Sequence, residues 1–213
     1  MSGIGLAGAH RVGKTTLAKA FADSFDIAYI PSVTSDIIRS HGIDAADDCD
    51  FWLRMKIQWE ILAVHEAAYQ EAKGMFIADR TPLDFIAYAL ADVTRDNIAP
   101  EQSVELMNYK SACVHTINRY FNVLTVIQPG VKFVDEPGKP KHIEAYVNHI
   151  NAIICGLASS EKSIMVLTTY MPKNLIDLNS RVSAVESSVR MAFDRFEKSA
   201  IKKGAIDISK SIH

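Results

Sequence analysis

The feature that most constrains this chain is a loop bounded by glycines near its start, Gly8 to Thr15, which reads G-A-H-R-V-G-K-T. The apolar run IGLA precedes the loop, and TTLAKAFA, which has the composition of a helix, follows it. A strand entering such a loop and a helix leaving it form the setting in which backbone N–H groups and a helix N-terminus bind phosphates. The pattern therefore predicts an α/β protein that binds a nucleoside triphosphate.

The residues of this loop have separate expected roles. Gly8 and Gly13 give the backbone the freedom to turn its N–H groups toward the phosphates. Lys14 is expected to contact the β- and γ-phosphates, Thr15 to coordinate Mg²⁺ through its hydroxyl, and Thr16 to contact the α-phosphate. The expected nucleotide-binding residues are Gly8, Ala9, His10, Arg11, Val12, Gly13, Lys14, Thr15 and Thr16.

The rest of the chain alternates between apolar runs and helical patterns. Buried parallel strands are predicted at 3–8, 27–30, 75–79, 123–128 and 163–168. Helices are predicted at 14–24, 50–73, 82–93, 100–119 and 141–157, before a final helix whose apolar stripe runs from Leu175 to Phe196. This alternation predicts one domain over residues 1–213, with a mostly parallel sheet and helices on both faces.

Composition and charge limit the classes of partner. The 213 residues carry a formal net charge of -2, so DNA binding would need a local basic patch and a small substrate fits more easily. Cys49, Cys113 and Cys155 lie far apart, which argues against a disulfide framework or a zinc site. No apolar run has the length of a membrane span and no targeting segment is evident at the N-terminus, so the expected location is cytoplasmic.

Asp79 and Arg80 stand at the end of the third predicted strand, MFIAD. Because ligands bind at the C-terminal edge of a parallel sheet, Asp79 is expected beside the phosphates. There it would either hold Mg²⁺ through water or take the proton of an attacking hydroxyl. The structural alternative is that Asp79 caps the next helix and Arg80 forms a surface ion pair.

Together, the loop, the Asp79-Arg80 pair, IQWEIL in the preceding helix and the closing VLTTY resemble the P-loop nucleoside and nucleotide kinases, including the thymidylate kinase and ribosylnicotinamide kinase types. The resemblance covers most of the chain's layout. It implies a three-layer sandwich with a five-stranded parallel sheet of order 2-3-1-4-5, flanking helices and a small lid, and ATP as the donor. It also implies that Asp79 faces the acceptor and that Arg80 binds a phosphate of the acceptor or of the donor.

The segment 129–141, PGVKFVDEPGKPK, has the composition of a surface loop and takes the place of the lid. Kinases of this group commonly carry arginines in the lid, whereas this chain has none between Arg119 and Arg181. Either lysines supply the charge, or Arg119 or Arg181 does, or the lysines only form a solvated face. The lid candidates are Lys132, Lys139 and Lys141.

The acceptor is expected between the segment after the second strand and the long helix at 50–73. On the family resemblance, Gln58 is a candidate for reading a base, Arg39 for binding an acceptor phosphate and Trp52 for stacking. The alternative for the large apolar residues of this helix is that they simply pack the core; these residues are Phe51, Met55, Ile57, Trp59, Leu62 and Tyr69.

The function that these observations favour is an ATP-dependent kinase that transfers the γ-phosphoryl group directly, in line, to a nucleoside or nucleotide. Its catalytic residues would be Lys14, Asp79 and Arg80. Three alternatives stay open: a viral kinase that phosphorylates a hydroxymethylated pyrimidine within DNA, an ATP-hydrolysing switch or ATPase module, and a kinase of small metabolites. A homodimer is also left open.

Overall fold

The computed structural model describes residues 2–44, 49–93, 98–131 and 143–202. Strands and helices alternate along the chain, as the sequence predicts. In order, they are β1 (Ser2–Ala7), α1 (Lys14–Phe25), β2 (Ala28–Ile30), α2 (Thr34–Ser40), α3 (Phe51–Glu71), β3 (Met75–Asp79), α4 (Pro82–Ala91), α5 (Pro100–Tyr120), β4 (Phe121–Ile127), α6 (Glu144–Ser160), β5 (Leu167–Met171) and α7 (Leu178–Lys202).

The five strands form one sheet of order β2-β3-β1-β4-β5, and every pairing is parallel. This confirms the predicted topology. Since all strands run the same way, their C-terminal ends share one edge, and β1 and β3 are neighbours in register with Leu6 opposite Asp79. The loop after β1 and the residues after β3 are therefore brought together.

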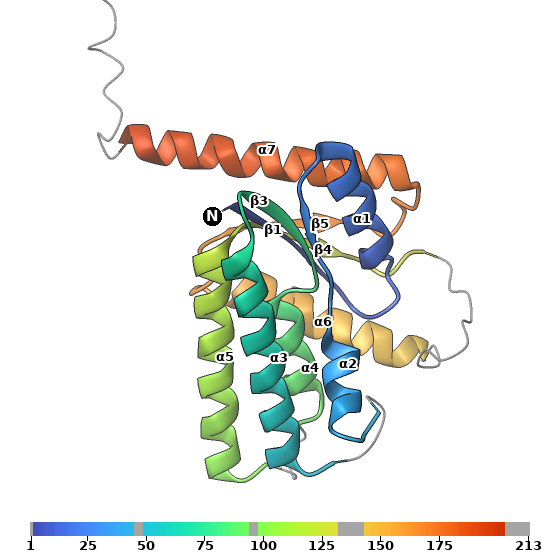
Figure 1. The fold of residues 1–213 in the computed structure, drawn as a ribbon, viewed down its shortest axis with the longest axis vertical. Coiled ribbons are helices and arrows are strands. Elements are labelled where there is room, and N and C mark those ends of the chain that lie inside the picture. The colour runs from blue at the N-terminus through green and yellow to red at the C-terminus, as the bar shows by residue number, and fades with distance from the viewer. Residues whose placement is uncertain (1, 45–48, 94–97, 132–142, 203–213) are drawn as a thin grey trace, which may run out of the picture.

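Helices cover both faces of the sheet (Figure 1). The view places α1 and α7 on one side and α3, α4, α5 and α6 on the other. One buried cluster surrounds the sheet and includes Leu6, Phe76 and Leu124. A second lies among α3, α4 and α5 and includes Ile61 and Tyr109, so the helical side of the protein has a core of its own.

Two elements differ from the prediction. The last strand covers Leu167–Met171 rather than 163–168, because pairing with β4 sets its register, with Val123 opposite Leu167. Met165 instead donates its backbone N–H to Asn118 on α5, over 2.9 Å. The short helix α2 had not been predicted.

The apolar stripe of the last helix is only partly buried. Val185 is fully buried against the sheet, but Phe193 and Phe196 are 42% and 69% exposed. Figure 1 shows the C-terminal end of α7 extending past the strands, so this end of the helix has no sheet to pack on. The apolar stripe therefore predicts the helix correctly, but a smaller part of that helix is buried than the stripe suggests.

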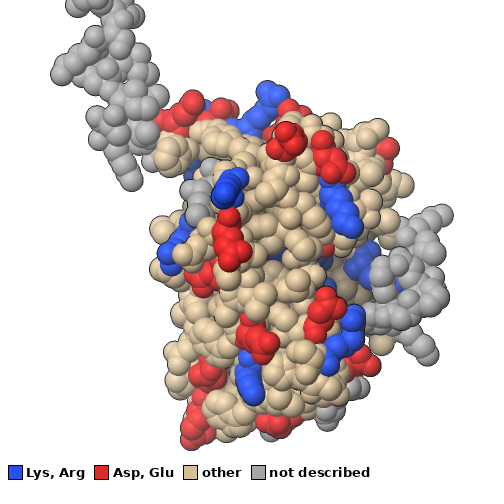
Figure 2. All heavy atoms as spheres, viewed as in Figure 1, with Lys and Arg blue, Asp and Glu red and all other residues tan. Residues whose placement is uncertain are grey.

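Acidic and basic side chains are interspersed over the face of the molecule that Figure 2 shows. Within the described ranges, no helix has both the length and the apolar character to cross a bilayer. The lid candidates Lys132, Lys139 and Lys141 lie outside the described residues.

Candidate phosphate-binding site

The loop between β1 and α1 has the backbone that its two glycines predict. Gly8 has φ 153° and Gly13 has φ 81°, the latter in the left-handed region where a side chain is strained. A Cβ on Gly8 would also lie 2.8 Å from the carbonyl oxygen of Ile127. The two glycines therefore allow the chain to turn tightly between the sheet and α1.

Lys14 begins α1 and points back across the loop. Its Nζ donates to the carbonyl oxygens of Gly8 and Ala9, over 2.6 and 2.7 Å, and lies 3.8 Å from Asp84 Oδ1. Burial, and next the nearby Arg80, lower the pKa of Lys14 to about 8. Lys14 is thus a buried cation whose present partners are mainly loop carbonyls.

This lowered pKa predicts a pH dependence of stability. The native Lys14 loses its proton near pH 8, whereas an unfolded lysine holds it to about its ordinary value of 10.5. The native state therefore binds fewer protons between these pH values, and the stability that depends on Lys14 rises with pH across this window. We expect urea unfolding to show that, from pH 8 to pH 10, the free energy of unfolding of the parent rises relative to that of Lys14→Met. An unchanged difference would contradict the lowered pKa.

Asp84, on the first turn of α4, is a buried residue that contacts the phosphate loop. It is fully buried, and its Oδ1 accepts the backbone N–H of Gly8 over 3.0 Å. Its Oδ2 accepts the backbone N–H and the hydroxyl of Thr81, over 3.0 and 2.9 Å. Burial raises the pKa of Asp84, while Lys14 and Arg80 oppose that rise. One carboxylate therefore ties α4 to the start of the phosphate loop.

Sequence reasoning did not identify Asp84 as a site residue. The signal was available in part, because T-P-L-D resembles the capping-box pattern in which the side chain at the third helical position accepts the N-cap N–H. That pattern accounts for the bonds to Thr81. It says nothing of Gly8, which lies 76 residues earlier.

Asp84→Asn is expected to lower the free energy of unfolding by about 1–3 kcal/mol, because an amide replaces one accepting oxygen with a donor and leaves a buried N–H without its acceptor. Urea denaturation measures this loss. Asp36→Asn, at an exposed position, is the matched control and should change stability little. Equal stability of Asp84→Asn and the parent would contradict the role of Asp84 as an anchor.

Thr15 and Asp79 meet at the opening of the loop. The Thr15 hydroxyl donates to Asp79 Oδ2 over 2.6 Å, across 64 residues of sequence. Burial, and then the neighbouring Asp79 carboxylate, raise the pKa of Tyr29 to about 12. A hydroxyl and a carboxylate are the hard oxygen ligands that Mg²⁺ prefers. The residues present therefore fit the expected metal ion.

The structural alternative for Asp79 and Arg80 is wrong. Asp79 is the last residue of β3, and Thr81 rather than Asp79 is the N-cap of α4. Arg80 is half-buried, and its guanidinium lies 5.1 Å from the centroid of the Tyr88 ring. Its φ of 86° is unusual for a residue with a side chain, and such strained backbone clusters at functional sites.

Tyr88, on α4, joins Arg80 to the loop. Its hydroxyl accepts the backbone N–H of His10 over 2.9 Å and lies 3.1 Å from His10 Nδ1. The His10 ring also lies 5.7 Å from that of Tyr146 on α6. No local pattern in the sequence indicates Tyr88. His10, one of the expected nucleotide-binding residues, thus contacts both α4 and α6.

The three acceptor-side candidates are not brought together by any contact among the described residues. Gln58 accepts a hydrogen bond from the Tyr109 hydroxyl over 3.1 Å, on the side of α3 that faces α5. Arg39 is exposed and pairs with Asp36, and Trp52 is 53% exposed. Their roles stay predictions. The alternative reading of the other apolar residues in this helix, as core, is confirmed for Met55, Ile57, Leu62 and Tyr69.

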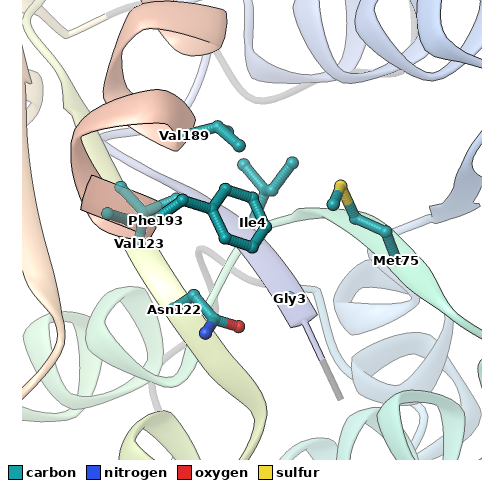
Figure 3. Close-up of a pocket in the computed structure, with 8 residues that line it drawn as sticks. Gly3, Ile4, Met75, Asn122, Val123, Val189 and Phe193 are labelled. Carbon is teal, nitrogen blue, oxygen red and sulfur yellow. The ribbon is translucent and has the colours of Figure 1, made fainter. Parts of the chain in front are cut away.

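Two hollows lie away from the loop. One, of about 10 Å³, sits under α7 at the N-terminal edge of the sheet and has room for about one water molecule (Figure 3). It is lined by Gly3, Ile4, Met75, Asn122, Val123, Val189, Ala192 and Phe193. The other, of about 230 Å³, lies between α3 and α5 and includes Trp59 and His115. Neither is part of the phosphate site.

The two alternative lid arginines have different positions. Arg119 ends α5, just before β4 begins, and lies 3.8 Å from Glu66. It is therefore at the N-terminal edge of the sheet, opposite the loop. Arg181, on α7, contacts the loop itself.

Comparison with known proteins gives one family match. Residues 4–127 match the family model described as an AAA domain, a range that includes the loop, Asp79-Arg80, Asp84 and Tyr88. No curated protein sequence matches the chain.

Several solved structures share the fold. NadR in complex with NR has a TM-score of 0.66 at 14% identity, and NadR with NAD and AMP-PNP has 0.61 at 15%. Both comparisons cover 88% of this chain, which spans about half the length of NadR, 50% and 49%.

Two kinases match over nearly their whole length. Deoxyadenosine kinase from M. mycoides has a TM-score of 0.62 at 12% identity, covering 89% of this chain and 98% of the kinase. Thymidylate kinase from Candida albicans has 0.51 at 14%, covering 89% and 91%. At these identities the likeness concerns the fold alone.

Proposed function

We propose that this chain, which belongs to the AAA domain family and has the fold of P-loop nucleoside and nucleotide kinases, is an ATP-dependent kinase that phosphorylates a nucleoside or nucleotide. The proposal rests on one observation, the contact between the phosphate loop after β1 and the C-terminal end of β3. The Thr15 hydroxyl donates to the Asp79 carboxylate over 2.6 Å, and each of these residues has a cation next to it in the sequence, Lys14 before Thr15 and Arg80 after Asp79. A triphosphate in the loop would then have its γ-phosphate near one carboxylate and two cations.

The residues of the site would divide the work as follows. Lys14 exchanges the neutral carbonyl oxygens of Gly8 and Ala9 for anionic phosphate oxygens, which adds charged partners to the Asp84 carboxylate 3.8 Å away. Arg80 offers a planar set of donors to the phosphoryl group during transfer. Asp79 already accepts from Thr15, which favours a role beside the metal ion over a role as general base.

Bound Mg²⁺ would neutralise charge on the β- and γ-phosphates. In the transfer, an acceptor oxygen attacks the γ-phosphorus and the bond from that phosphorus to the β–γ bridging oxygen breaks, leaving ADP. A hydroxyl acceptor loses its proton to solvent or to a carboxylate. The protein's contribution is then mainly positioning and charge.

The class of acceptor and donor is suggested by the fold neighbours. These neighbours include a deoxyadenosine kinase, a thymidylate kinase, and NadR in complex with NR or with NAD and AMP-PNP. We carry over to this chain a nucleoside-type acceptor and ATP as the donor. The cytoplasmic location, the lid lysines, the acceptor-side residues and a homodimer stay predictions.

The test is a panel assay. The purified chain is mixed with ATP and Mg²⁺ and, one at a time, with nucleosides, nucleoside monophosphates, small metabolites and hydroxymethylated DNA. Mass spectrometry should find a phosphorylated nucleoside or nucleotide in amounts equal to the ADP formed. A product only with small metabolites, or only with DNA, would replace the proposed acceptor.

A second candidate is an ATP-hydrolysing switch or ATPase module, which the sequence left open and which is compatible with the match to an AAA domain. The same assay separates the two. Release of inorganic phosphate from ATP, with no phosphorylated acceptor in any mixture, would favour an ATPase module and contradict the kinase.

A further inference from the structure

Arg181 is a buried arginine that reaches the phosphate loop from the far end of the sequence. It lies near the start of α7 and is 4% exposed. Its Nη2 donates to the carbonyl oxygen of Val12 over 2.8 Å, and its Nε lies 3.2 Å from Met171 Sδ. Val12 and Arg181 are 169 residues apart, so the contact joins the loop before the first helix, α1, to the last helix, α7.

This position is an unfavourable one for a charge. No carboxylate within the described ranges forms an ion pair with Arg181, and burial lowers its pKa. The N-terminus of α1, which carries a partial positive charge, follows directly after the loop. A buried cation without a carboxylate is a weak contributor to stability, which points to another reason for its place here.

That reason follows from the geometry of the peptide bond. The Val12–Gly13 peptide, like every peptide bond of the described chain, is not cis, and a trans peptide is planar with its C=O and N–H pointing in opposite directions. A guanidinium that holds the Val12 oxygen toward α7 therefore turns the Gly13 N–H away from α7. The left-handed φ of Gly13, 81°, belongs to this same arrangement.

The fit between Arg181 and the loop is close. A Cβ on Gly13 would lie 2.8 Å from Arg181 Nη1. The glycine thus leaves space for the guanidinium as well as supplying the backbone conformation. The arginine and the glycine act as a pair.

We propose that Arg181 is a positioning residue that fixes the orientation of the Val12–Gly13 peptide, so that the Gly13 N–H faces the site of the nucleotide's phosphates. This inference rests on the proposed nucleotide binding. Arg181 lies outside the loop motif and would orient one backbone N–H that donates to a phosphate. The loop would therefore have its binding conformation before the nucleotide binds.

The experiment compares Arg181→Met with the parent and with Arg190→Met. Arg190 lies on the same helix, is exposed and pairs with Glu186, so its variant is the matched control. Met keeps the unbranched apolar stem of the side chain and removes a cation for which the described residues offer no carboxylate partner, so the variant should fold. If it does not, Arg181→Gln takes its place.

The first measurement uses the nucleotide-free proteins. The ¹⁵N-labelled Gly13 amide should shift, and its sequential NOE to Val12 should change, in Arg181→Met but not in Arg190→Met. An unchanged Gly13 amide in a folded Arg181 variant would overturn the inference, whatever happens to nucleotide binding.

The second measurement is the affinity for AMP-PNP with Mg²⁺ by calorimetry. Loss of the ordered donor should raise the Kd of Arg181→Met roughly tenfold or more, while the KM for the acceptor changes little. An unaltered Kd would also overturn the inference. Failure of the parent itself to bind AMP-PNP would overturn the proposed function instead, and the Gly13 spectra would still decide the orientation of the peptide.

Discussion

Lys14→Ala is expected to reduce kcat/KM by about a hundredfold or more, to a level near the background of a phosphoryl-transfer assay. The Lys14 ammonium is buried, donates to the carbonyl oxygens of Gly8 and Ala9, and has the Asp84 carboxylate 3.8 Å away. A triphosphate would replace the neutral carbonyl partners with anionic oxygens. Removal of the ammonium deletes that attraction from both the bound state and the transition state, so the Kd for ATP should rise as well.

The control for Lys14→Ala is Lys56→Ala, which removes the same charge at an exposed position of α3. It should keep the activity of the parent. Both proteins are first compared by thermal unfolding, because Lys14 also contacts Gly8 and Ala9 and its loss could disturb the loop. A folded Lys14→Ala protein that retains parental activity would contradict the phosphate-binding role of the loop.

The parts of this site that could be predicted from sequence are the parts encoded locally. The loop, the strand before it and the helix after it are continuous in sequence, and the strand end at Asp79 is marked by the apolar run that feeds it. Parallel pairing then placed Asp79 one strand away from the loop, where the Thr15 hydroxyl reaches it. The sheet order followed from the family resemblance and is confirmed.

The residues that escaped prediction are those that tertiary structure brings in. Asp84, Tyr88 and Arg181 contact the loop from 76, 78 and 169 residues away. The sequence pattern marks Asp84 only as a helix cap, gives no signal for Tyr88, and makes Arg181 only an alternative source of charge for the lid, with no contact to the loop expected of any of them. Only the packing of α4 and α7 around the loop shows that three polar groups fix three of its backbone atoms.

The acceptor side is harder for a related reason. α3 packs against α2, α4 and α5, so apolar residues point in several directions and no single face can be assigned to a cleft. Gln58 illustrates this, since its side chain faces Tyr109 on α5. The choice of acceptor therefore depends on contacts that periodicity does not encode.

Asp79→Asn is the second change with a large expected effect. The amide has the shape of the carboxylate, and its oxygen still accepts from the Thr15 hydroxyl, so the fold and the loop should be preserved. What is lost is the negative charge at the point where a metal ion would bridge protein and phosphates. We therefore expect kcat to fall by roughly a hundredfold or more, whereas the Kd for ATP without Mg²⁺ changes by less than about threefold.

The comparison that decides the role of Asp79 is the dependence of activity on Mg²⁺ concentration. If Asp79 acts beside the metal ion, the variant should need a higher concentration of Mg²⁺ for half-maximal activity, and part of the lost activity should return at saturation. If Asp79 is instead the base for a hydroxyl acceptor, the Mg²⁺ requirement stays that of the parent and kcat becomes independent of pH where the parent's rises. Parental activity in Asp79→Asn would remove this residue from the mechanism altogether. The hydrogen bond from Thr15 favours the first outcome, because a carboxylate that already accepts from this hydroxyl, the proposed ligand of Mg²⁺, is poorly placed to receive a proton from the acceptor.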